Sequence, residues 1–97
     1  MLKVLITCVC LLGSTYGVMA HATSVVFLNP GLSNETYWVS YSQFMQAAAK
    51  DLGLDLRVRY AERDSHATLV QAREELQGRE RPHYLVLVNE QYFAPQI

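Results

Sequence analysis

Two short segments, residues 25–28 and 84–88, are apolar at every position, and patterns of helix, strand and helix lie between them. A strand that is apolar on both faces is typical of the centre of a parallel sheet, whose two faces are covered by helices. The order strand, helix, strand, helix, strand therefore predicts an α/β fold with parallel strands and right-handed helical crossovers.

The first expected helix follows a turn at residues 29–31, where a proline and a glycine end the strand. Ser33 or Asn34 is expected to cap the start of this helix, and Gly53 suits the position just past its end. Its apolar side chains recur at helical spacing and form one stripe. The stripe consists of Tyr41, Phe44, Met45, Ala48, Ala49 and Leu52.

The middle strand is indicated by the segment LDLRVRY, residues 54–60, in which apolar and polar side chains alternate strictly. Such alternation is typical of a half-exposed strand at a sheet edge. A second helix is expected to begin at a cap, Asp64 or Ser65, and to end at Gly78. The resulting strand order is 2-1-3, with the two helices on opposite faces of a doubly wound, Rossmann-like sheet.

The first 22 residues have the pattern of a secretory signal peptide. Lys3 gives a positive start, and the apolar stretch that follows is shorter than the roughly 20 residues that span a bilayer. Residues 20–22 form an A-x-A cleavage pattern. We expect cleavage after Ala22, or else after Ala20, and a periplasmic protein; a membrane anchor is the alternative.

The remaining segment, residues 23–97, is expected to lack thiol chemistry, because Cys8 and Cys10 both lie in the leader. The chain has eight Lys and Arg against nine Asp and Glu and no basic stripe, which argues against a nucleic-acid partner. It has no glycine-rich phosphate loop, no metal-ligand spacing and no nucleophile elbow. We therefore expect no catalytic residue, no metal and no cofactor.

The segment closes with NEQYFAPQI, which has the pattern of a turn followed by the start of another helix. The apolar strand at residues 84–88 would then have one unpaired edge, and such an edge favours aggregation. We therefore expect residues 23–97 to be the N-terminal, incomplete part of a larger lobe. A truncated gene product and a complete small domain are the alternatives.

Ligands of doubly wound sheets bind beyond the carboxyl ends of the strands, at the switch point where neighbouring connections diverge. Here that point is expected between the first and third strands, beside the loops at residues 29–38 and 89–92. Both loops combine aromatic rings, which stack on a sugar face, with amides or carboxylates, which bind hydroxyls. Each of these residues also has an alternative role. Tyr37 and Trp38 can pack over the sheet end, and Asn29 can serve only the turn. Glu90 can be solvated or cap a helix, Asp64 can cap a helix, and His66 and His83 can have surface or structural roles.

The stretch VVFLNPGLSNETYWVSYSQFMQAAAKDLGLDLRV, continued by RPHYLVLVNE, resembles the first half of the N-terminal lobe of type I periplasmic solute-binding proteins, the ribose- and galactose-binding class. The resemblance implies two hinged lobes that bind a ligand between them. It places ligand contacts at Tyr37 and Trp38, with Asn34 near them, and at Asn89 and Glu90. Sugar binders commonly have Asp near the last position, so neither a pentose nor a hexose is implied.

The function expected from this resemblance is that of the solute-binding component of an ABC-type uptake system, without enzymatic activity. The expected partners are a small polar ligand, for which a sugar is the first candidate, and a membrane permease. One alternative is a periplasmic receptor that presents its ligand to a sensor histidine kinase. Another is an exported flavodoxin-like or α/β enzyme, which would need a nucleophile or a phosphate loop elsewhere.

Overall fold

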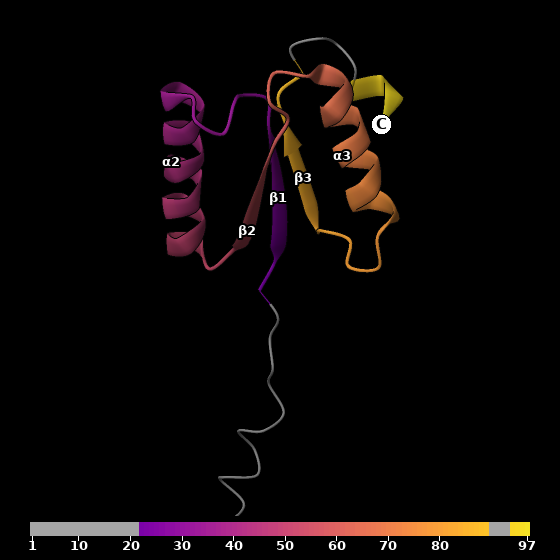
Figure 1. The fold of residues 1–97 in the computed structure, drawn as a ribbon. Helices are drawn as coiled ribbons and strands as arrows, with labels where there is room; N and C mark the ends of the chain where they lie inside the picture. The colour runs from indigo at the N-terminus through magenta and orange to yellow at the C-terminus, as the bar shows by residue number, and fades with distance from the viewer. Residues whose placement is uncertain (1–21, 90–93) are drawn as a thin grey trace, which may run out of the picture.

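The computed structural model describes residues 22–89 and 94–97. Strands and helices alternate along the chain, with one helix on each side of the sheet (Figure 1). No helix in the described residues is long and apolar enough to cross a membrane. The elements are β1 (Ser24–Asn29), α2 (Thr36–Leu52), β2 (Asp55–Tyr60), α3 (Ser65–Gln77), β3 (Tyr84–Leu87) and the 3-10 helix η1 (Ala94–Gln96).

The three strands form a parallel sheet in the order β2-β1-β3. In the register of β1 with β2, Ser24 lies opposite Asp55 and Asn29 opposite Tyr60. On the other side of β1, Leu28 lies opposite Leu87 of β3. The predicted fold class and strand order are confirmed, and α2 and α3 cover opposite faces, as right-handed crossovers in opposite directions require (Figure 1).

The core is built around β1, because its side chains alternate between two covered faces. Val26 and Leu28 are completely buried and pack against Ala72 of α3. On the other face, the ring of Phe27 lies 5.7 Å from that of Tyr41 on α2, measured between centroids. The segment that was expected to be central is therefore central.

An apolar groove of about 350 Å³ runs between α2 and β3 on the face that α2 covers. The predicted stripe of α2 lines it rather than being buried in full: the side chain of Phe44 is 75% exposed. Within the described residues, β3 pairs with β1 alone, so its other edge has no strand partner there, as the predicted order 2-1-3 implies. The groove is lined among others by Phe44, Met45 and Leu52 of α2, by Val25 of β1, and by Tyr84 and Val86 of β3.

The ends of α2 confirm one predicted cap and contradict the other. Gly53 is left-handed, with φ of 71°, and its N–H contacts the last carbonyl groups of the helix. At the start, however, the capping position belongs to Glu35, and no side chain makes a capping hydrogen bond there. Ser33 and Asn34 lie inside a turn that the Glu35 N–H closes on the Leu32 carbonyl, so they precede the capping position by two residues and one residue.

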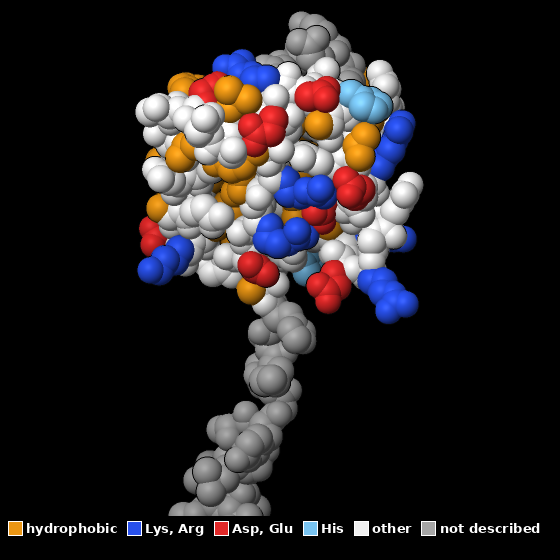
Figure 2. Space-filling model, viewed as in Figure 1, with side chains coloured by type: hydrophobic (Ala, Val, Ile, Leu, Met, Phe, Trp, Pro, Cys, Tyr) orange, Lys and Arg blue, Asp and Glu red, His pale blue; other side chains and the backbone are white. Residues whose placement is uncertain are grey.

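The start of α3 is capped by Asp64, as predicted: its carboxylate accepts a hydrogen bond from the His66 N–H at 3.0 Å. The polar side of β2 differs from the solvated face that the alternation indicated. Arg57 and Arg59 point toward α3, where Glu75 accepts from their guanidinium groups at 2.8 and 3.2 Å. Figure 2 shows basic and acidic side chains gathered over the region of β2 and α3.

Candidate functional site

The carboxyl ends of β1, β2 and β3 all lie at one end of the sheet, because the strands run parallel (Figure 1). Leu28 and Leu87 are register partners, so the turn after β1 and Asn89 after β3 extend from neighbouring strands at the same edge. This is the switch point that the sequence predicted, since α2 leaves β1 toward one face and α3 reaches β3 from the other.

The first residue of this edge, Asn29, is occupied by internal hydrogen bonds. Its side chain is completely buried, and its Nδ2 donates to the Trp38 carbonyl at 2.8 Å and to the Ser42 hydroxyl at 2.7 Å. Its Oδ1 accepts from the Gly31 N–H at 2.9 Å. Asn29 thus ties the turn after β1 to the first turns of α2, which is the turn role left open as the alternative to ligand contact.

Trp38 packs directly on the backbone of that turn. A Cβ atom on Gly31 would lie 2.2 Å from the indole ring, so only glycine leaves room for it there. The indole is half-buried, and its centroid lies 5.7 Å from the ring of Tyr41. The ring therefore packs against the turn after β1, and this packing over the sheet end is one of the roles expected for Trp38.

Tyr37 is the ring of this cluster that faces solvent most openly, with 66% of it exposed. It meets Trp38 edge to face, with the centroids 5.0 Å apart and the planes at 90°. Asn34, in the turn before α2, is exposed as well. Together these side chains present two aromatic rings and an amide at the carboxyl edge.

On the neighbouring strand, Asn89 is exposed two residues beyond the end of β3. Glu90 lies outside the described residues. No group of three or more His, Cys, Asp or Glu that could hold a metal ion is found in residues 22–89 and 94–97. His83, for its part, accepts a hydrogen bond from the Ser24 N–H through Nδ1 at 2.9 Å, a structural link between the starts of two strands.

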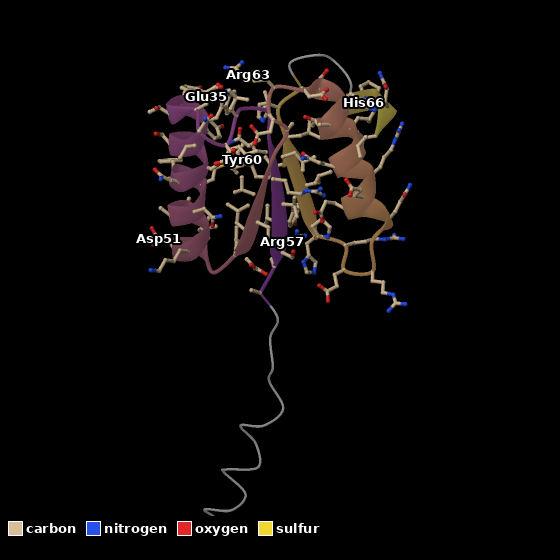
Figure 3. All side chains as sticks on the ribbon, viewed as in Figure 1. Glu35, Asp51, Arg57, Tyr60, Arg63 and His66 are labelled. Atoms are coloured by element: carbon tan, nitrogen blue, oxygen red, sulfur yellow. The ribbon has the colours of Figure 1, made fainter. Side chains whose placement is uncertain are left out.

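Sequence reasoning did not single out Glu35 and Glu62, which contact the residues around the candidate rings. The guanidinium of Arg63, in the loop after β2, binds both carboxylate oxygens of Glu35 (Figure 3). This hydrogen bonding lowers the pKa of Glu35 from its ordinary value. No local pattern links residues 28 positions apart, so the sequence carried no signal for this pair.

No protein-family model matches the chain, and no match was found among curated proteins. A crystal structure of a periplasmic sugar-binding protein from Pseudomonas fluorescens is similar to it, with 77% sequence identity and a TM-score of 0.73. The match covers 76% of this chain and 23% of that protein. The predicted resemblance is confirmed.

The match covers most of this chain but only a small part of the sugar-binding protein. The chain spans 23% of the length of the sugar-binding protein that it resembles, so that protein has a much larger part without a counterpart here. Over the matched part, an identity of 77% accompanies the parallel β2-β1-β3 sheet described above.

Proposed function

We propose that the chain belongs to the solute-binding component of an ABC-type uptake system, which holds a sugar or a similar small polar ligand between two lobes. The observation that carries the proposal is the 77% identity to a periplasmic sugar-binding protein. A binding role without catalysis fits this similarity. The chain supplies part of one lobe, so we expect ligand binding only in a form of the protein that has both lobes.

The proposed ligand site consists of Asn34, Tyr37 and Trp38 on one side and Asn89 and Glu90 on the other. The exposure of Tyr37 and its edge-to-face contact with Trp38 support stacking of a sugar ring on this aromatic pair. The exposed amides support hydrogen bonding to hydroxyl groups. The parallel strands end at one edge of the sheet, and this supports a shared cleft for those of the groups that the structure describes.

The test is a calorimetric titration of the two-lobe protein with a panel of monosaccharides that includes ribose and galactose. We expect one of them to bind, and we expect Trp38→Ala to weaken that binding by about 1–3 kcal/mol, the scale of a lost stacking contact at a binding hot spot. Tyr37→Ala should weaken it as well, and this variant leaves the packing on Gly31 in place.

Phe44→Ala is the matched control, because this ring is exposed on the same helix but lines the apolar groove instead of the carboxyl edge. Its affinity should equal that of the unmodified protein. Unchanged affinity in Trp38→Ala, with circular dichroism showing an intact fold, would remove Trp38 from the site. Failure of every monosaccharide to bind would remove sugar as the ligand class.

We also propose a periplasmic location, supported by the location of the similar protein, and export through a signal peptide that is cleaved after Ala22. Residues 1–21 lie outside the described part of the structure. The proposed partner is a membrane permease, with a sensor histidine kinase as the second candidate. Mass spectrometry of the exported protein tests the cleavage: a chain that starts at Thr23 supports it, and a chain that still starts at Met1 contradicts it.

A further inference from the structure

The loop between β2 and α3 lies against the turn after β1 and is hydrogen-bonded to it through the backbone. The N–H groups of residues 61–63 donate to the carbonyl groups of residues 29–31. Two loops that come from different strands are therefore joined as one unit at the carboxyl edge. The bonded pairs are Ala61 with Asn29 at 2.8 Å, Glu62 with Gly31 at 3.1 Å, and Arg63 with Pro30 at 2.9 Å.

Two side chains of the same loop extend this connection to the start of α2. The Arg63 guanidinium donates to Glu35, from Nε at 2.8 Å and from Nη2 at 2.6 Å, in a geometry that only arginine provides. The Glu62 carboxylate accepts from the Ser33 N–H at 3.1 Å. Figure 3 shows Glu35 and Arg63 side by side at this edge, directly before the helix that carries Tyr37 and Trp38.

The backbone at Glu62 and Arg63 is unusual for residues with long side chains. Their φ angles are 53° and 66°, in the left-handed region that glycine occupies without a steric penalty. Glycine at these positions would satisfy the backbone but would lose both side-chain contacts to the start of α2. Such outliers persist where the surroundings fix them, and they concentrate at functional sites.

We propose that Glu62 and Arg63 are positioning residues for the aromatic pair: they fix the start of α2 and thereby the orientation of Tyr37 and Trp38. The inference rests on the proposed function, in which these two rings contact the ligand. It assigns a role to a loop that itself makes no proposed ligand contact. The orientation of the rings is measurable without a ligand, so the two proposals can fail separately.

The experiment uses Trp38 as its probe, because it is the one tryptophan of the 97-residue chain. Fluorescence quenching by acrylamide measures how accessible its indole ring is. In Arg63→Ala the quenching constant should rise about twofold, because a helix start released from its contacts opens locally. Glu35→Gln should give a smaller rise, and the double variant should resemble Arg63→Ala, since both changes remove the same interaction.

Conservative changes separate positioning from a general loss of stability. Arg63→Lys keeps the charge but not the two-point geometry, so its quenching should lie between those of the unmodified chain and Arg63→Ala. Glu74→Gln is the matched control, because it removes a carboxylate from another exposed ion pair, with Arg59 on the far side of the sheet. Leu28→Ala lowers stability in the core and should leave quenching unchanged well below its melting temperature.

The inference would be overturned if Arg63→Ala is folded, as judged by circular dichroism, and has the same quenching constant as the unmodified chain. If Arg63→Ala does not fold, Arg63→Lys and Glu62→Ala decide in the same way, because Glu62→Ala removes the acceptor of the Ser33 N–H. In the two-lobe protein, altered quenching together with weaker monosaccharide binding supports both proposals. Altered quenching with unchanged affinity supports the positioning role and overturns the assignment of the rings to the ligand site.

Discussion

The two faces of the sheet are closed to very different degrees. On the face under α3, Val26 and Leu28 are completely buried against Ala72, and Leu85 and Leu87 of β3 pack beside them. On the face under α2, the side chains of Phe44 and Val86 remain exposed along the apolar groove. Both helices carry apolar side chains at helical spacing. This spacing alone therefore does not predict how much of each sheet face a helix covers.

The difference follows from where each helix lies. α3 packs against the central strand β1, whereas α2 packs chiefly against the edge strand β2 and leaves β3 uncovered on its side. The groove on the face of α2 is therefore the part of the sheet beside β3 that α2 does not reach.

The largest expected effect is on the closed face. Leu28→Ala should lower the free energy of unfolding by about 2–5 kcal/mol, because the side chain is 0% exposed and a cavity would remain. Phe44→Ala on the open face should change it by no more than about 0.5 kcal/mol. Urea unfolding followed by circular dichroism measures both. Equal losses in the two variants would show that the faces are equally closed in solution.

The second effect concerns the charged part of the closed face, where Glu75 is buried and binds Arg57 and Arg59. Glu75→Gln should lower the free energy of unfolding by about 1–3 kcal/mol at neutral pH, because two guanidinium groups lose a largely buried partner. The exposure of Arg57 to solvent keeps the loss below that of a fully buried pair.

The pH dependence of this loss has a definite sign. The hydrogen bond from Arg57 lowers the pKa of Glu75 in the folded chain. A lowered pKa contributes stability above the unfolded-state pKa of about 4.3, and this contribution disappears as the pH falls through the folded-state value. The unmodified chain and Glu75→Gln should therefore converge in stability in acid. A constant difference between pH 7 and pH 3 would contradict the ion-pair account.

The smallest effect on stability is expected in the groove. Phe44→Gln should reduce the fluorescence of a bound apolar dye such as anilinonaphthalene sulfonate, while the free energy of unfolding changes by no more than about 0.5 kcal/mol. Leu76→Gln, which removes an exposed apolar side chain from α3 outside the groove, is the control. Equal dye fluorescence in the two variants would show that the groove is not the dye site.

The fold was predictable because its signals are local. The apolar residues 25–28, the alternation at residues 54–60 and the helical stripes each follow from a period of 2 or 3.6 residues. Gly53 and Asp64 were recognisable as helix boundaries for the same reason, since a cap acts within one turn. The cap expected at Ser33 or Asn34 was wrong, because an intervening turn shifts the helix start to Glu35.

The carboxyl edge was only partly predictable. Topology placed the turn after β1 and Asn89 at one edge, and the ligand roles of Asn34, Tyr37, Trp38, Asn89 and Glu90 stay predictions. The sequence could not distinguish whether Asn29 faces a ligand or the turn, because its partners Trp38 and Ser42 become neighbours only when α2 folds back. The bond between Glu35 and Arg63 depends in the same way on two loops meeting.

The amino-acid sequence by itself determined the order and type of the elements, the parallel sheet and the edge at which a ligand site is expected. Those features depend on side-chain periodicity and on the handedness of crossovers, which act over one element or one connection. Tertiary structure alone decided which face of the sheet is closed and which charges pair. Those outcomes depend on distances between elements far apart in the chain, and a one-dimensional pattern does not contain them.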